Sequence, residues 1–267
     1  MSLHFEVFPQ GLHLENCKPV VILPGLFGSI SNWRSFAKEL SKSTLVVVLD
    51  MRNHGRSPHY DSHSYIDMAN DVEEFCQQHK IRNIIPCGHS MGGKVALTFS
   101  LLFPHRVSSL VILDIAPVTY THSHAPFLEA LIDVDLEQIE SRKHADKLLE
   151  PVIADQSTRL FLLQSLVGRA GSFSWRLNLP VLRDYMPQIV SFPEQELAGK
   201  TSNIPTALVY GANSGYVDAK GISSTAVYFS DLYTESISEA AHWLHIDQPA
   251  LLIEAVKLFL RKVEKND

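Results

Sequence analysis

Short, continuously apolar runs alternate with amphipathic stretches along most of the chain. The apolar runs occupy residues 20–23, 44–50, 83–87, 109–114 and 206–211. Continuous rather than alternating hydrophobicity is typical of strands that are buried on both faces, as in a parallel sheet. Apolar positions recur at helical spacing in 33–40 and 65–75, with Ser64 as an N-cap for the second stretch. Strands that alternate with helices predict an α/β fold with a mostly parallel sheet flanked by helices.

The beginning, the middle and the end of the chain depart from this alternation. Residues 5–8 and 12–14 predict antiparallel edge strands. From 119 to 200 the helical patterns continue without convincing strands between them, which predicts a helical cap inserted into the body. The predicted core therefore comprises residues 1–118 and 201–267, and it closes with an amphipathic C-terminal helix.

Composition narrows the class of protein. The 267 residues are 45% hydrophobic and 19% charged, which is typical of one globular body rather than a disordered chain. A net charge of -6 without a Lys/Arg cluster argues against a nucleic-acid partner. The 13 histidines are scattered, so no metal site is expected, and three widely spaced cysteines favour reduced thiols over a disulfide framework. Without a signal-peptide pattern or an apolar run of about 20 residues, we predict a cytoplasmic protein with no membrane span.

The sequence GHSMGG places Ser90 at a predicted strand-to-helix junction. Gly88 and Gly92 flank Ser90 in the G-x-S-x-G spacing of a nucleophile elbow, where small neighbours permit a strained turn. A helix that begins there directs backbone N–H groups and its positive dipole end toward the reaction centre. A serine that only caps the helix is the alternative. Because a strand precedes and a helical pattern follows, the context favours a nucleophile.

A serine nucleophile needs a general base and an acid, which follow such an elbow in the chain order serine, acid, histidine. His242 lies in the loop after an apparent strand and is the predicted base, whereas His245 is expected to pack or cap the next helix. Asp114 ends an apolar run, where a carboxylate is costly unless it is paired. It is the predicted acid, with Asp218 as the alternative. Ser214 is expected to support the site by bridging acid and histidine through a hydrogen bond.

Acyl transfer also requires an oxyanion hole with two N–H donors. Met91, the residue after the nucleophile, supplies one donor, and Leu26, in the loop after residues 20–23, supplies the other. Gly25 allows the backbone of this loop to approach a substrate, and Pro24 has no N–H to offer.

A second loop, with the sequence DMRNHGRSPH, follows the run at 44–50. We interpret Asp50 and Arg52 as a hydrogen-bonded pair that shapes this loop. His54 and His89 are likewise expected to be packed or hydrogen-bonded rather than catalytic.

Seven motifs extend across the chain in order: PGLFGS, DMRNHGRSPH, GHSMGGKVA, LDIAPV, WRLNLPVL, GANSGYV and AHWLHID. Together they resemble the α/β-hydrolase superfamily, and within it the YbfF-type acyl esterases. The resemblance implies hydrolysis of short-chain esters and thioesters, including acyl-CoA, without a cofactor. It implies a triad of Ser90, Asp114 and His242 supported by Ser214. The chain departs from the family's usual His-Gly opening of the first loop with Pro24-Gly25, which puts the geometry of that loop in doubt.

The predicted partner is a small acyl ester or thioester. Phe27, Trp175 and Trp243 are candidates to line an acyl pocket. Arg176 is a candidate to bind a substrate carboxylate or phosphate, and tying the cap to the body is its alternative role. Two other functions remain open: hydrolysis of a carbon–carbon or lactone bond by the same triad, and non-catalytic ligand binding.

Overall fold

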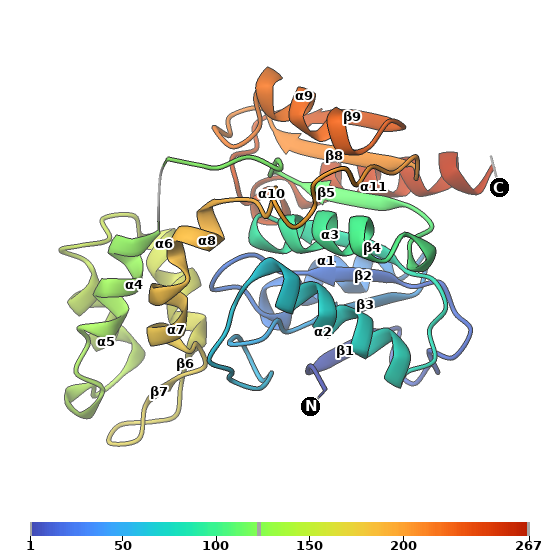
Figure 1. Cartoon of the computed structure of the whole chain (residues 1–267). Coiled ribbons are helices and arrows are strands. Elements are labelled where there is room, and N and C mark those ends of the chain that lie inside the picture. Colours follow the sequence, from blue (N-terminus) through green and yellow to red (C-terminus); the bar gives the residue numbers. More distant parts are fainter. Residues whose placement is uncertain (1, 122–123, 266–267) are drawn as a thin grey trace.

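The computed structural model describes residues 2–121 and 124–265 and centres on a seven-stranded sheet (Figure 1). The strands lie in the order β1-β3-β2-β4-β5-β8-β9. Their bounds are Phe5–Phe8 (β1), Val20–Leu23 (β2), Val46–Leu49 (β3), Ile85–His89 (β4), Leu110–Leu113 (β5), Thr206–Gly211 (β8) and Leu232–Ile237 (β9). β1 pairs antiparallel with β3, and the other neighbouring strands of this sheet pair in parallel. The predicted α/β fold with a mostly parallel sheet is confirmed.

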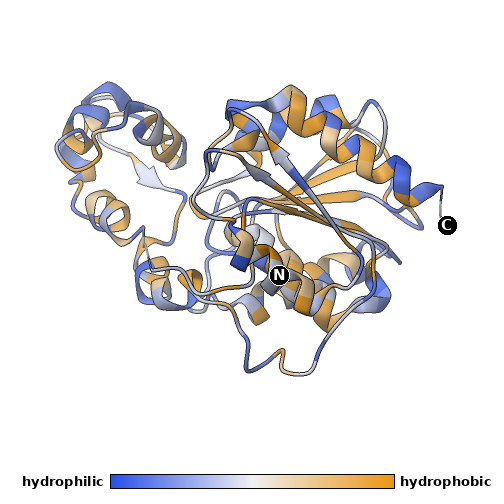
Figure 2. Cartoon of the chain, turned by 90° about the horizontal axis from the view of Figure 1, so that it is seen from above, coloured by the Kyte–Doolittle hydropathy of each residue, from blue (hydrophilic) through white to orange (hydrophobic). Residues whose placement is uncertain are grey.

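Both faces of this sheet are covered by helices. In β2, Val20 and Ile22 belong to the apolar cluster that contains α1 (Ile30–Leu40) and α11 (Pro249–Glu264). Val21 and Leu23 point the other way, into the cluster that contains α2 (Tyr65–Gln78) and α3 (Met91–Leu102). Figure 2 shows the apolar strands running between these helices. Successive residues of a strand are therefore all buried, which explains the continuous apolar runs.

The chain leaves the sheet after β5 and returns to it at β8. The intervening elements are α4 (Ala125–Ile132), η2 (Leu136–Gln138), α5 (Arg142–Leu149), α6 (Gln156–Leu162), η3 (Leu163–Ser165), β6 (Leu166–Val167), β7 (Ser174–Trp175), α7 (Leu179–Asp184) and α8 (Met186–Val190). Figure 1 shows them gathered to one side of the sheet. We call residues 119–200 the cap segment.

Two expectations about strands are wrong. Residues 12–14 form no strand, because the chain turns at Gly11, with φ of +84°, and continues as a loop. The cap segment, expected to be purely helical, contains the antiparallel pair β6–β7. Two strands of two residues each are too short to produce a periodic pattern in the sequence.

The remaining described elements complete the body. They are η1 (Pro104–Arg106), α9 (Ala219–Tyr228) and α10 (Leu244–Asp247). Ser64 caps α2 as predicted, since its side chain accepts a hydrogen bond from the Asp67 amide. Among the described helices, none combines the length and the apolarity needed to cross a bilayer. Burial raises the pKa of both the Cys76 and the Cys87 thiol to about 12, so neither is a ready nucleophile.

Candidate active site

Ser90 lies at the tight turn between β4 and the first turn of α3. Its backbone has φ of +53° and ψ of −121°, a conformation that L-residues rarely adopt. The flanking glycines make the turn possible. A Cβ on Gly88 would overlap the backbone of Gly92, and a Cβ on Gly92 would overlap the carbonyl oxygen of Leu23. The close approach of two backbone segments therefore requires glycine on either side of the serine.

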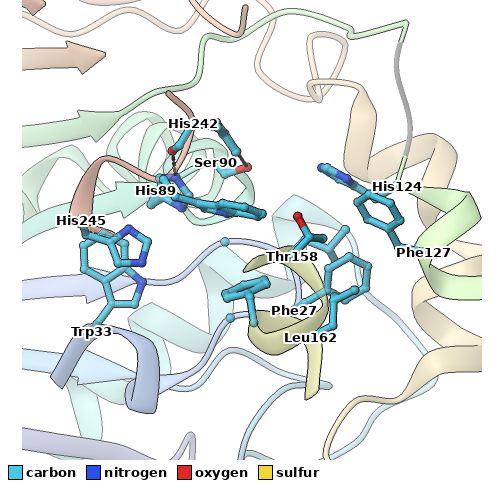
Figure 3. Close-up of a pocket in the computed structure, with 15 residues that line it drawn as sticks. Phe27, Trp33, His89, Ser90, His124, Phe127, Thr158, Leu162, His242 and His245 are labelled. Carbon is cyan, nitrogen blue, oxygen red and sulfur yellow. Dashed lines mark hydrogen bonds between the residues drawn. The ribbon is translucent and has the colours of Figure 1, made fainter. Parts of the chain in front are cut away.

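His242 and Asp114 complete a chain of hydrogen bonds that begins at Ser90. His242 Nε2 lies 2.9 Å from Ser90 Oγ, and His242 Nδ1 lies 2.7 Å from Asp114 Oδ2. The three side chains come from three different places in the fold: the β4–α3 turn, the end of β5, and the loop between β9 and α10. Figure 3 shows Ser90 and His242 facing one end of a cavity. Because the C-terminal ends of parallel strands meet at one edge, this arrangement is available to residues far apart in sequence.

Asp114 is fully buried, and its carboxylate oxygens accept several hydrogen bonds. It has φ of +51° and accepts from the Gly211 amide at 3.0 Å and from the Ser214 hydroxyl. Burial nevertheless raises the pKa of Asp114 to about 6, while these hydrogen bonds act in the opposite direction. Asp218, the alternative acid, caps α9 instead by accepting from the Gly221 amide at 2.8 Å.

Ser214 connects the acid with an aromatic residue that the sequence did not single out. Its hydroxyl donates to Asp114 and accepts from the Tyr216 amide at 3.2 Å, so the expected bridge to the histidine is wrong: His242 bonds Asp114 directly. The Tyr216 ring stacks on the His242 imidazole, with ring centroids 3.7 Å apart and planes inclined by 15°. The acid and the imidazole are therefore held from one short loop after β8.

Three other histidines around the site are buried and neutral. His89 Nε2 donates to the His242 carbonyl oxygen at 2.7 Å, and burial lowers the pKa of His89 to about 3. His54 Nε2 accepts from the Phe27 amide at 3.1 Å, and burial lowers the pKa of His54 to about 4. His245 stacks on Trp33 with ring centroids 4.1 Å apart. The structure thus places these three side chains in packing or hydrogen-bonding positions.

Two backbone N–H groups beside Ser90 are available to a substrate. Met91 is the first residue of α3, where an N–H has no partner within the helix. Leu26 and Ser90 line the same cavities, and neither the Leu26 nor the Met91 N–H is engaged by another residue of the described chain. The neighbouring Phe27 N–H, by contrast, donates to His54 Nε2 and is not available to a substrate.

The interpretation of Asp50 and Arg52 as partners is wrong. Asp50 accepts from the Ile30 amide at 2.7 Å and the Arg56 amide at 2.8 Å. Arg52 forms a two-pronged pair with Asp71 on α2, at 2.6 and 2.7 Å. The partner of Arg52 lies on an element that only the fold brings near, so the local sequence contains no sign of it.

Two apolar cavities meet at Ser90. The first includes Phe27 and Trp243, two of the candidate acyl-pocket residues, in its lining. The cap segment contributes five further lining residues: His124, Phe127, Thr158, Phe161 and Leu162. Figure 3 shows Phe127 and His124 across the cavity from Ser90. The second cavity lies against α3 and the loop after β8, and includes Lys94, Tyr120, Ile189 and Tyr216 in its lining.

Trp175 and Arg176 line neither of these cavities. Trp175 lies on β7 and pairs with Leu166, and the Arg176 amide donates to the Ser165 carbonyl at 2.9 Å. Both residues belong to the small β6–β7 hairpin of the cap segment, so neither is part of the substrate site as predicted.

The sequence analysis did not identify three cavity residues of the cap segment, which are Phe127, Phe161 and Leu162. Helical periodicity shows that their helices have an apolar face, but it does not reveal which face turns toward Ser90.

Comparison with known proteins assigns the family. The model of the alpha/beta hydrolase fold family matches residues 18–249. The chain belongs to the α/β-hydrolase family. It is 38% identical over 252 residues to the sn-1-specific diacylglycerol lipase ABHD11 of Mus musculus, covering 90% of this chain and 80% of that protein. Esterase YbfF of Escherichia coli is 31% identical over 247 residues, with 92% of this chain and 94% of that protein covered.

A solved structure agrees over nearly the whole α/β-hydrolase chain. The structure titled Marine microorganism esterase superposes with a TM-score of 0.89 at 33% identity, covering 97% of this chain and 99% of that one. The resemblance to the YbfF esterases is confirmed. Relatives named as esterases and lipases agree with the carboxylic ester hydrolase that the sequence predicts.

Proposed function

We propose that this α/β-hydrolase cleaves short-chain acyl esters, and acyl-CoA thioesters as a second substrate class, through an acyl-enzyme on Ser90. The observation that carries the proposal is the hydrogen-bonded series from Ser90 Oγ through His242 to Asp114, at 2.9 and 2.7 Å, at the junction of two apolar cavities. Candidates for all three triad roles are present and in contact, which argues against a purely ligand-binding protein.

In the proposed reaction His242 Nε2 removes the proton from Ser90 as Oγ attacks the carbonyl carbon. The Leu26 and Met91 N–H groups donate to the oxygen that becomes negative. His242 then donates its proton to the leaving alcohol or thiol. Water enters, loses a proton to His242 and releases the acid, which restores Ser90. Asp114 holds the proton on His242 Nδ1, so that Nε2 presents its lone pair to the serine.

The two cavities suit a substrate with two arms. An ester has an acyl part and an alcohol part on opposite sides of its carbonyl carbon, and here separate cavities extend from Ser90. Their linings are mostly apolar, which stabilises hydrocarbon by removing it from water, at about 0.8 kcal/mol per buried CH₂. A finite cavity gains from added methylenes only until it is filled.

Turnover of p-nitrophenyl esters from acetate to laurate should therefore rise over the first members and then fall. Short acyl-CoA thioesters should be hydrolysed in parallel. The Phe161→Ala variant removes a ring from the wall of the larger cavity and should move the preferred acyl chain to greater length. Leu160→Ala is the matched control, because Leu160 is the exposed neighbour on the same helix. The measurement is kcat/KM for each substrate.

Other outcomes of the substrate panel would favour one of the two alternative functions, hydrolysis of another bond or ligand binding without catalysis. A diacylglycerol, a lactone and a vinylogous diketone are included at equal concentration. Selective turnover of the lactone or the diketone would replace ester hydrolysis by the alternative bond. Saturable binding of an ester without product release would favour a binding protein.

The ester hydrolase activity should decline as the pH falls through about 6. At that pH Asp114 takes up a proton, since burial raises its pKa to about 6, and a neutral carboxyl no longer orients the imidazolium. The folded state holds this proton more tightly than the unfolded chain does, so protonation of Asp114 adds stability as the pH falls. Loss of activity from this group is therefore separate from unfolding. A profile of kcat/KM from pH 4.5 to 9, with circular dichroism at each pH, tests this, and a profile that stays flat below pH 6 would contradict it.

A further inference from the structure

Lys94 is a buried cation one turn beyond the nucleophile on α3. Its side chain is 1% exposed, and Nζ donates to three backbone carbonyl oxygens: Val118 at 3.0 Å, Val190 at 2.9 Å and Ser191 at 2.6 Å. Nζ also lies 4.8 Å from the centre of the Tyr120 ring. Within the described chain no carboxylate lies within salt-bridge distance of it. Since a buried ammonium is costly, the carbonyl oxygens and the aromatic face must stabilise it.

The three acceptors belong to the two connections between the sheet and the cap segment. Residues 115–121, the outgoing connector, run from the end of β5 into the cap segment, and residues 189–193, the returning connector, comprise the end of α8 and the first residues after it, where the cap segment leads back toward β8 (Figure 1). The connectors lie side by side, because the Tyr120 amide donates to the Val190 carbonyl at 2.9 Å. Val190 thus accepts from Tyr120 and Lys94 together. A single ammonium therefore joins both connectors to α3, the helix that begins directly after Ser90.

The same residues form a wall of the second cavity. Lys94, Tyr120, Ile189 and Val190 line it together with Ser90. Tyr65 of α2 adds a tie of its own, since its hydroxyl donates to the Ile189 carbonyl at 2.6 Å. A shift of either connector would change the shape of the space beside the nucleophile.

We propose that Lys94 is a positioning residue: it ties both cap connectors to the nucleophile helix and so holds the cavity wall beside Ser90 in place. Lys94 does not touch the reacting atoms, because its donors are directed at backbone carbonyls. Without it, three carbonyl oxygens lose a charged donor, while the Tyr120–Val190 bond between the connectors and the Tyr65–Ile189 and Tyr120–Tyr216 bonds to the body remain. The effect on substrate rests on the proposed ester hydrolysis, whereas the effect on the connectors does not.

The Lys94→Met variant tests the tie directly, because methionine keeps most of the volume and removes every donor. Amide hydrogen exchange should speed up at least about tenfold at residues 118–120 and 189–191 while the exchange of α1 stays as in the parent. Measurement at pH 6 keeps the amine charged, since burial lowers its pKa to about 7. Lys94→Gln, which retains two N–H donors, should show an intermediate effect.

Thr98→Val is the matched control on the same helix. Thr98 is fully buried, and its hydroxyl has no hydrogen-bond partner in the described chain. This variant changes a buried polar group of α3 whose hydroxyl makes no hydrogen bond to either connector, so exchange at the connectors should match that of the parent.

Kinetics provide the second readout. With p-nitrophenyl esters, Lys94→Met should raise KM by about tenfold while kcat changes by less than about threefold, because the cavity wall moves and the triad does not. Unchanged exchange at the connectors in the folded Met and Gln variants would overturn the proposal. Faster exchange spread evenly over the sheet would also overturn it, since that is the result of lost global stability. If the parent protein fails to hydrolyse esters, the proposed function is wrong. Amide hydrogen exchange at the connectors still tests the positioning role of Lys94 in that case.

Discussion

Replacing Ser90 by alanine should lower kcat/KM for p-nitrophenyl esters by about 10⁴- to 10⁶-fold, the range found when a serine nucleophile is removed from a triad. The substitution deletes the only atom that attacks the carbonyl in the proposed reaction. The hydrogen bonds that hold the turn are made by the Ser90 backbone: its amide donates to the Leu113 carbonyl, and its carbonyl accepts from the amides of Gly93 and Lys94. Alanine keeps these, so the fold and the melting temperature should be preserved.

Covalent labelling gives an independent measurement of the same prediction. A fluorophosphonate should add one label to the parent protein at Ser90 and none to Ser90→Ala, as read by intact mass and peptide mapping. Residual activity of the alanine variant within about tenfold of the parent, in a preparation free of other esterases, would remove Ser90 from the mechanism.

Asp114→Asn should cost about 10⁴-fold in kcat, as substitution of the triad acid does in serine proteases. An amide at position 114 donates to His242 Nδ1 and so favours the imidazole tautomer that carries its proton on Nε2. That tautomer cannot accept a proton from Ser90. Folding should not suffer, because burial disfavours the charged carboxylate and the neutral amide avoids that cost.

Asp218→Asn is the matched control for the acid. Asparagine is as good an N-cap as aspartate, so α9 should keep its first turn and activity should stay within a few-fold of the parent. Measurement of kcat and melting temperature for both variants decides between the two carboxylates. The opposite ranking, with Asp218→Asn the more damaging, would assign the acid to Asp218.

Local chemistry explains which parts of this protein can be predicted from sequence. A strand buried on both faces must be apolar at every position, so β2, β3 and β5 are visible as uninterrupted runs. The nucleophile turn is equally local. Ser90 can adopt its strained backbone conformation only between Gly88 and Gly92. These three residues lie within five consecutive positions, so their spacing can be recognised in the sequence.

Features that depend on contacts between residues distant in sequence produce no recognisable local pattern. The partner of Arg52 is Asp71 on a separate helix, and the pairing that we predicted with Asp50 is absent. The short β6–β7 hairpin has no periodicity to detect. The distinction between Trp175 and Phe161 as cavity residues depends on which side of the cap segment faces Ser90.

The sequence by itself determined the alternation of strands and helices in the body, the expectation of a cap insertion, and the strand-to-helix turn at Ser90, because each depends on periodicity or on a few adjacent residues. It also determined that a histidine and an acid had to follow, with His242 and Asp114 preferred. Only the tertiary structure brought Asp114 to 2.7 Å from His242 and turned Asp218 into a helix cap. It alone assembled the two cavities and placed Lys94 under both cap connectors. Such contacts join segments distant in sequence, and their free energy depends on the position of the partner, which no local pattern contains.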